Sequence, residues 1–195
     1  SKQSHGVHDF LEHLDNRGRV GSNPARSAGC RLRPPGARAQ GAGPGRAQGG
    51  AMNWTDYWNQ DTTIYANDRH KQVHYEGIAR DLMACIRSPA ARVVDYGCGE
   101  ALSAGRVAVA CGHLYLCDSA SRTRERLAAR LAGVRNLSII SPQEFEALPG
   151  GSVDLIVANS VVQYLSAEQF AAFLTTSRAK LAAGGELVLG DIIPR

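Results

Sequence analysis

One short run constrains this chain most: an apolar strand that ends in an acid and turns at once through two glycines, VVDYGCGE at residues 93–100. Gly97 and Gly99 can adopt positive φ and carry no Cβ, so the backbone can reverse sharply there and lie directly against a ligand. Residues 101–111 predict a helix, whose first N–H groups would face that turn. A dinucleotide-binding turn would need a third glycine three residues after Gly99, where the chain has Leu102.

A second acid follows at the end of the next predicted strand. The run 113–117 leads into Asp118, which lies 21 residues after Gly97. An acid at the tip of the second strand of a βαβ unit lies beside the first turn and can accept hydrogen bonds from both ribose hydroxyls of a nucleoside. Asp118 could instead cap the helix that begins near Ser119. Its spacing from the glycine turn favours the ribose role, with an unphosphorylated nucleoside as the ligand.

From Met52 onward, predicted strands and helices alternate. Strands are expected at 92–95, 113–117, 137–140, 153–158 and 186–191, and helices at 67–86, 101–111, 119–132 and 143–148, with a last helix from a capping box at Ser166 to Gly184 and Gly185. Strands rich in Val, Ile and Leu between amphipathic helices predict an α/β fold with a doubly wound, mainly parallel sheet that is covered on both faces. The site is then expected at the carboxyl ends of the first, second and fourth strands, where the strand order reverses.

The glycine turn also carries a resemblance to a known family. The pattern at 93–99, two apolar residues followed by Asp-x-Gly-x-Gly, resembles the first motif of the class I S-adenosylmethionine (SAM) dependent methyltransferases, which usually have a further glycine where this chain has Ala101. The resemblance covers nearly all of residues 52–195, including the Gly-Gly turn before the last predicted strand. Family members normally continue into a sixth strand and an antiparallel seventh. The resemblance therefore implies a Rossmann-like methyltransferase domain truncated after its fifth strand, which would leave that strand as an uncovered edge.

The same resemblance implies SAM as the cofactor and assigns roles to residues around the turn. The backbone of Gly97, Cys98 and Gly99 would line the methionine and ribose portion of SAM. Asp95 would approach the methionyl ammonium, and Asp118 would bind the ribose hydroxyls. The other implied contacts are Ser119 against the adenine, Glu144 on the adenine amino group, the Ala158 carbonyl and Asn159 under the sulfonium, and Tyr57 and Tyr65 over the methionine carboxylate. Glu144 could equally be a solvated carboxylate at a helix start, and the two tyrosines could be core anchors.

No catalytic base can be assigned from the sequence. Methyl transfer from SAM needs mainly in-line placement of the acceptor and exclusion of water, and it needs a base only where the acceptor must lose a proton. The candidates are His70, His74 and His113, and we expect His113 to be structural because it begins a buried strand. His70 and His74 lie four residues apart on one helix face, but no third ligand is evident, so no metal site is expected.

The segment after the fourth strand narrows the class of methyl acceptor. Methyltransferases that act on amino groups of DNA bases or of protein glutamine carry an Asn/Asp-Pro-Pro-aromatic run there, whereas this chain has NSVVQY at 159–164. The net charge of +4 divides into +5 over residues 1–51 and −1 over 52–195, so the globular part has no electrostatic case for nucleic acid. Both observations favour a small-molecule acceptor. The alternatives are a SAM-binding or partner-binding module without activity and an NAD-dependent oxidoreductase, which Leu102 disfavours.

Residues 1–51 differ in character from the rest of the chain. They are rich in Gly, Arg, Ala and Pro and hold few large apolar side chains, so we expect a disordered tag, linker or upstream sequence before a methyltransferase domain at 52–195. The chain has no apolar run of membrane-spanning length and no signal-peptide core. Its five cysteines form no C-x-x-C pair, so reduced thiols in a cytoplasmic protein are expected. The sequence gives no indication of the oligomeric state.

Overall fold

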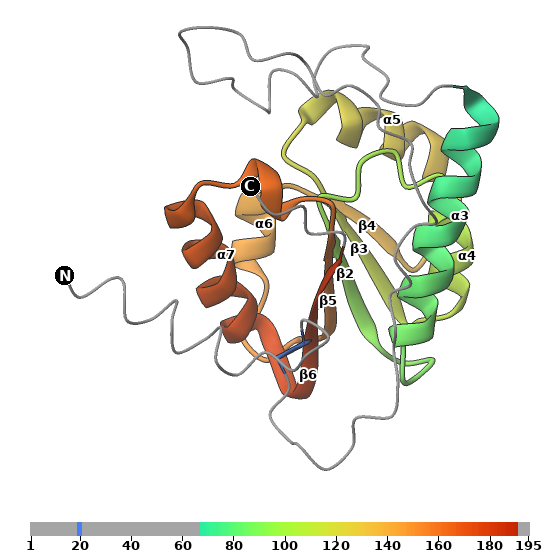
Figure 1. Ribbon diagram of the computed structural model, residues 1–195. Helices are drawn as coiled ribbons and strands as arrows, with labels where there is room; N and C mark the ends of the chain where they lie inside the picture. The colour runs from blue at the N-terminus through green and yellow to red at the C-terminus, as the bar shows by residue number, and fades with distance from the viewer. Residues whose placement is uncertain (1–18, 21–66, 191–195) are drawn as a thin grey trace, which may run out of the picture.

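The computed structural model describes residues 19–20 and 67–190, and at its centre lies a sheet with helices on both faces (Figure 1). The strands are β1 (Arg19–Val20), β2 (Arg92–Tyr96), β3 (His113–Cys117), β4 (Leu137–Ile140), β5 (Val153–Asn159) and β6 (Leu181–Gly190). Their order across the sheet is β1-β6-β5-β2-β3-β4, and every pair is parallel except β1 with β6. The doubly wound, mainly parallel sheet that the sequence predicts is confirmed.

Each face of the sheet has its own hydrophobic core because side chains alternate along a strand. The first face is covered by α3 (Asp68–Cys85), α4 (Ala104–Val109) and α5 (Ser121–Leu131), and the second by α6 (Pro142–Ala147) and α7 (Ala167–Lys180) (Figure 1). In β2, Val93 packs into the first core and Val94 into the second, and neither side chain is exposed. Strands that are buried on both sides account for the continuous apolar runs in the sequence.

Two helices differ at one end from the sequence prediction. α4 begins later than residue 101, because Ala101 has a positive φ of 39° that a right-handed helix cannot contain. α7 ends at Lys180 and not at the glycine pair, because Leu181 is already extended. Gly184, with φ 79°, instead bends the chain inside β6.

Two further expectations are wrong. The sequence predicted an uncovered edge at the last strand, but the backbone of Arg19–Val20 pairs antiparallel with Leu187 and Val188 of β6 and so satisfies part of that edge. The sequence also predicted reduced thiols throughout, but Cys85 at the end of α3 is disulfide-bonded. The cysteines that are buried and free are Cys98, Cys111 and Cys117.

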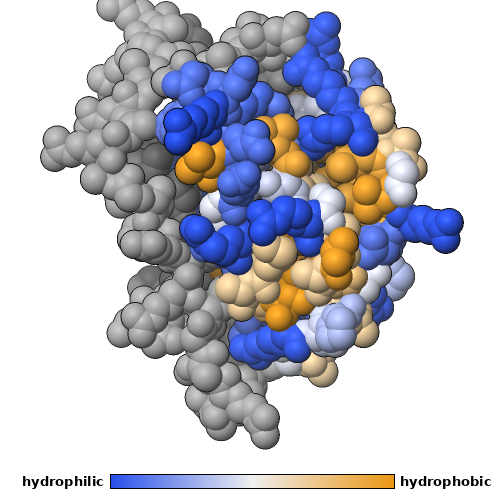
Figure 2. All heavy atoms as spheres, turned by 90° about the vertical axis from the view of Figure 1, so that its right-hand side faces the viewer, coloured by the Kyte–Doolittle hydropathy of each residue, from blue (hydrophilic) through white to orange (hydrophobic). Residues whose placement is uncertain are grey.

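The face that carries α3 and α4 mixes polar and apolar residues (Figure 2). In the described part of the chain, three large hydrophobic side chains are exposed, namely Val73, Leu102 and Val109. They belong to α3, to the loop before α4 and to α4 itself, and isolated exposed side chains of this kind are usual on soluble domains. No helix between residues 67 and 190 is long and apolar enough to cross a membrane.

Candidate ligand-binding site

The predicted site lies where the strand order reverses, between β2 and its neighbours β3 and β5. Within the sheet, Asp95 near the end of β2 is paired with Leu116 of β3 on one side and with Val157 of β5 on the other. The carboxyl ends of these three strands therefore meet at one edge. Asp118 follows β3 directly and Asn159 ends β5, so the fold brings the predicted residues of the three segments to the same edge.

The glycine turn after β2 has the conformation that its sequence predicts. Gly97 and Gly99 have φ values of 71° and 54°, in the left-handed region that favours glycine. The N–H groups of Gly97 and Cys98 donate to the carbonyl oxygen of Cys117 at 2.7 and 3.1 Å, which ties the turn to the end of β3. A Cβ on Gly97 would lie 2.1 Å from Cγ2 of Val161, so only glycine fits beneath that side chain.

Asp118 accepts two backbone hydrogen bonds at this edge. Gly99 N–H donates to its Oδ2 at 3.0 Å, and Ala120 N–H donates to its Oδ1 at 2.9 Å. The helix cap that the sequence left open as an alternative is wrong, because the N-cap of α5 is Ala120 and no side chain caps that helix. Burial raises the pKa of Asp118, while the hydrogen bonds from Ala120 and Gly99 and the charge of Arg124 offset part of that effect.

Asp95 is the most deeply buried carboxyl of the site, with 9% of the residue exposed. No hydrogen bond from the described residues offsets the effect of that burial on its ionisation. Burial, and then the neighbouring charge of Asp118, raises the pKa of Asp95 to about 7. An acid whose ionisation is disfavoured by burial and by a neighbouring carboxyl creates a place where a ligand cation is stabilised.

Side chains from α3 and α5 hold the loop between β2 and α4. The hydroxyl oxygen of Tyr75 accepts from Glu100 N–H at 3.1 Å, and Lys71 forms an ion pair with the Glu100 side chain. From the other side, Arg130 of α5 donates to the carbonyl oxygens of Glu100 and, at 3.0 Å, of Ala101. Sequence reasoning missed these contacts, because a hydrogen bond or ion pair between separate elements leaves no mark on residue spacing.

Glu144 does what the simpler of its two interpretations predicted. It is fully exposed at the third position of α6, where its Oε2 accepts from Ser141 N–H at 2.7 Å and the Ser141 hydroxyl accepts from Glu144 N–H at 3.2 Å. These hydrogen bonds hold the pKa of Glu144 below its usual range. The reciprocal pair is a capping box, so the carboxylate at this helix start has a structural role whatever else it binds.

Of the remaining predicted residues, the structure describes Asn159 but not the two tyrosines. Asn159 donates from Nδ2 to the Ser160 hydroxyl at 3.2 Å, and Ser160 has a positive φ of 57°. A short 3₁₀ helix, Val162–Tyr164, follows directly. Tyr57 and Tyr65 lie outside the described residues.

Of the three histidine candidates, His113 lies away from the glycine turn. His113 begins β3, at the opposite edge of the sheet, and its Nε2 lies 2.9 Å from the Ser138 hydroxyl, which is the structural role that the sequence predicted. His70 and His74 both lie on α3, as predicted. Within residues 67–190 no group of three or more His, Cys, Asp or Glu side chains is arranged to hold a metal ion.

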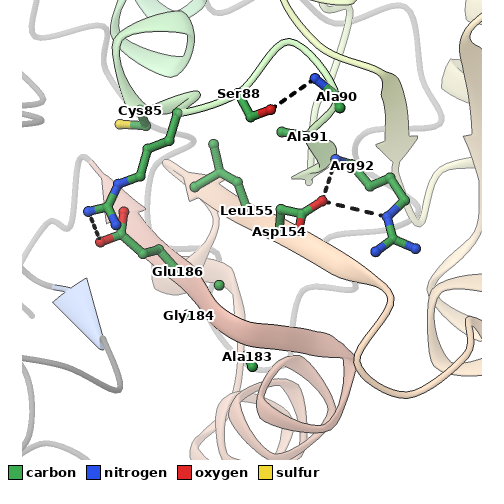
Figure 3. A pocket seen from close by; sticks show the side chains of 12 residues that line it. Cys85, Ser88, Ala90, Ala91, Arg92, Asp154, Leu155, Ala183, Gly184 and Glu186 are labelled. Carbon is green, nitrogen blue, oxygen red and sulfur yellow. Dashed lines mark hydrogen bonds and ion pairs between the residues drawn. The ribbon is translucent and has the colours of Figure 1, made fainter.

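A cavity of about 510 Å³ opens at the amino ends of the strands, on the side of the sheet opposite to the glycine turn (Figure 3). Two ion pairs border it, Arg87 with Glu186 and Arg92 with Asp154, at 2.5 and 3.5 Å. The arginine of each ion pair already faces a carboxylate, and none of the residues predicted to bind the cofactor lines this cavity. The cavity and the predicted site are therefore separate features of the fold.

Comparison with known proteins gives a consistent match. The family model described as a methyltransferase domain matches residues 94–189. Among solved structures, phosphoethanolamine N-methyltransferase 1 of Haemonchus contortus, in complex with phosphoethanolamine and S-adenosylhomocysteine, is 22% identical with a TM-score of 0.58. That match covers 70% of this chain and 30% of the other. No curated protein matches the chain.

Two other solved structures have the same fold. A SAM-dependent methyltransferase of Leishmania major is 22% identical with a TM-score of 0.56, over 69% of this chain and 58% of that one. A Haloferax volcanii methyltransferase in complex with a methyltransferase activator is 22% identical with a TM-score of 0.51, over 72% and 61%. The chain thus spans between 30% and 61% of the length of these three proteins.

Proposed function

This chain belongs to the class I SAM-dependent methyltransferases, and from that premise we propose that it binds SAM at the glycine turn and directs its methyl group to a small-molecule acceptor. The observation that supports the proposal best is the pair of carboxyls, buried Asp95 and half-buried Asp118, beside a turn whose two glycines have positive φ. This arrangement fits a ligand that has a cation at one end and a ribose diol at the other.

The residues present fit SAM. Asp95 is a buried acid whose ionisation no hydrogen bond from the described residues supports, and the methionyl ammonium would supply both a donor and a positive charge. Asp118 uses one acceptor site on each oxygen for backbone N–H groups. Because a carboxylate has about four such sites, acceptors remain for the two ribose hydroxyls. Gly97, Cys98 and Gly99 would present bare backbone to the same ligand.

The other residues that the resemblance assigns extend this site toward both ends of the cofactor. Ser119, directly after Asp118, would lie against the adenine, and the Glu144 oxygen that the capping box leaves over, Oε1, would accept from the adenine amino group. The Ala158 carbonyl and Asn159 would face the sulfonium from the end of β5. Tyr57 and Tyr65 would cover the methionine carboxylate.

When bound, SAM supplies an activated methyl group, so the chain has to contribute placement and exclusion of water more than acid–base chemistry. The segment at 159–164 follows β5 at the same edge as the turn and would face the acceptor. It lacks the two prolines of enzymes that hold planar amino groups of DNA or protein, and residues 52–195 carry a net charge of −1. Both features support a small-molecule acceptor over a polyanion.

A second function rests on the length comparison. Because the chain spans only part of its structural neighbours, the alternative function is a module that binds SAM or a partner and does not transfer the methyl group. Measuring S-adenosylhomocysteine formation across a panel of small hydroxyl, amine, thiol and carbon acceptors separates the two functions. The proposed enzyme forms S-adenosylhomocysteine with at least one acceptor class, whereas a binding module takes up SAM and forms none.

The ribose assignment predicts the effect of one substitution. Asp118→Ala should weaken SAM binding by roughly 1.5–3 kcal/mol, or about 10- to 150-fold, because charged hydrogen bonds to two hydroxyls are lost. Isothermal titration calorimetry with SAM and S-adenosylhomocysteine measures this directly, with thermal unfolding to verify that the variant is folded. Glu125→Ala, an exposed acid on α5, is the matched control and should leave the affinity unchanged. Equal affinity of Asp118→Ala and the parent chain would contradict the ribose role.

A further inference from the structure

The guanidinium of Arg124 forms hydrogen bonds with the backbone of the loop between β3 and α5. It lies in the first turn of α5, and its Nη1 donates to two successive carbonyl oxygens, that of Asp118 at 2.8 Å and that of Ser119 at 2.9 Å. Both contacts have the length of charge-assisted hydrogen bonds. The backbone of the two residues proposed to meet ribose and adenine is thus held by one side chain.

The rest of that loop has few other anchors. No side chain caps the start of α5, because its N-cap is Ala120. The carboxylate of Asp118 is tied to Gly99 N–H and Ala120 N–H, which fixes the side chain relative to the glycine turn. Arg124 fixes the main chain of the same residue relative to the helix. The direction in which the Asp118 carboxylate points therefore depends on both sets of contacts.

We infer that Arg124 is a positioning residue for nucleoside binding: it holds the backbone of Asp118 and Ser119, and this fixes the orientation in which the Asp118 carboxylate meets the ribose hydroxyls. This inference rests on the proposed function and deepens it. The residue does not touch the proposed ligand in this account but acts through Asp118. Nothing in the sequence pattern points to Arg124, because one more basic residue on a helix rich in arginine carries no signal of its own.

The charges around Asp118 give this inference a second, electrostatic basis. Among the described residues, the titratable and charged groups that act on Asp118 or share its environment are Asp95 and Tyr96 of β2, Cys98 of the turn, Cys117 of β3, Arg124 of α5 and Glu144 of α6. Arg124 is the cation in this set, and it lowers the pKa of Asp118 against the effect of burial. Removing its charge should therefore raise the pKa of Asp118.

Two substitutions separate the charge of Arg124 from its fork of donors. Arg124→Met removes both, whereas Arg124→Lys keeps the charge and loses the two-carbonyl geometry. Arg126→Met, an exposed position on the same helix, is the matched control. We expect calorimetry at pH 8 to show SAM bound about tenfold more weakly by Arg124→Met, at an intermediate level by Arg124→Lys, and unchanged by the control.

A second readout reports on Asp118 without any ligand. In a carbon-13 NMR titration of the side-chain carboxyl, the midpoint of Asp118 should move to higher pH in Arg124→Met and stay near the parent value in Arg124→Lys and Arg126→Met. A role limited to folding would lower thermal stability without moving this midpoint, so a lower melting temperature alone counts against the inference.

The outcomes distinguish this inference from the proposed function. A parent chain that binds no SAM overturns the proposed function, and with it the ligand role of Arg124. A parent chain that binds SAM, beside an Arg124→Met variant with the same affinity and the same Asp118 midpoint, overturns the role of Arg124 alone. Weaker binding together with the shifted midpoint supports the inference.

Discussion

At the scale of single residues, Asp95 and Asp118 determine which ligands the site can accept. Asp95 is buried and Asp118 half-buried at the ends of neighbouring strands, and the pKa of each is raised. A ligand that brings positive charge stabilises the ionised form of these carboxyls, whereas a pyrophosphate would add further negative charge beside them. The pair of acids therefore favours the ammonium and sulfonium of SAM over the phosphates of NAD, in agreement with Leu102 at the third position of the glycine pattern.

The raised pKa of Asp95 predicts how stability depends on pH. Because the folded-state pKa of about 7 exceeds the ordinary value of 3.8, the folded chain binds more protons between these values, and stability falls as the pH rises from about 4 to about 7. The full effect is roughly 4 kcal/mol, from 1.36 kcal/mol for each pKa unit. Urea denaturation of the chain without ligand, at pH 5 and at pH 8, measures the part of this loss that falls above pH 5, about 3 kcal/mol.

Asp95→Asn should remove most of that dependence, because an amide does not ionise. A smaller slope of the same sign should remain from Asp118, whose pKa is also raised. Asp154→Asn, a partly exposed carboxyl at the opposite edge of the sheet, is the control and should keep the parent slope. If the parent chain is no less stable at pH 8 than at pH 5, the account of Asp95 is wrong.

Single residues also show where sequence reasoning ends. The positive φ of Gly97 and Gly99 followed from the local pattern, because a strand that turns within two residues favours that conformation. The contact of the Tyr75 hydroxyl with Glu100 N–H and the contacts of Arg124 with backbone carbonyl oxygens did not, since a hydrogen bond between a side chain and a backbone group leaves no mark on residue spacing. Such contacts become visible only once the elements are placed in space.

At the scale of elements, strands were predicted better than helix ends. The strands at 113–117 and 137–140 match the structure residue for residue, because a buried parallel strand is a continuous apolar run between polar turns. Helix ends depend on the backbone conformation of one residue. Ala101 with positive φ delays α4, and its family position usually holds glycine, so this departure was the available signal. The early end of α7 had none, because Gly184 bends a strand there and does not cap a helix.

The two capping boxes make a matched pair for a prediction about elements. Ser166 with Gln169 begins α7 as the sequence predicted, and Ser141 with Glu144 begins α6. Ser166→Ala and Ser141→Ala should each lower the free energy of unfolding by about 1 kcal/mol, because each exposes an unsatisfied helix N–H. Urea denaturation measures both.

SAM binding should distinguish the two variants. Ser141→Ala frees Glu144, which is proposed to meet the adenine, so its affinity for SAM should fall a few-fold. Ser166→Ala should keep the parent affinity, because neither Ser166 nor Gln169 is proposed to contact SAM. If Ser141→Ala retains full affinity at a measurable loss of stability, Glu144 caps a helix and does nothing more.

At the scale of the whole molecule, strand order locates the function. Reversal of the order between β2 and β5 places the glycine turn, Asp118 and the end of β5 at one edge, while the cavity bordered by Arg87 and Arg92 lies at the other. The sequence pattern predicted this reversal at the carboxyl ends of the first, second and fourth expected strands. The pairing of Arg19–Val20 with β6 was not predicted, because two residues in a segment without apolar periodicity give no strand signal.

The most direct test of the central claim is a calorimetric titration of the chain with SAM, run beside NAD and beside the Gly97→Val variant. The account predicts that the parent binds SAM and S-adenosylhomocysteine but not NAD. It also predicts that Gly97→Val loses SAM, since a Cβ there meets Val161 at 2.1 Å and a φ of 71° strains a β-branched residue. Far-UV circular dichroism verifies that the sheet of Gly97→Val is intact. A double variant, Gly97→Val with Val161→Ala, removes the contact with Val161 and is measured in the same way. A parent chain that binds NAD in preference to SAM, or a folded Gly97→Val variant with the parent's affinity for SAM, would contradict the claim that this turn is the cofactor site.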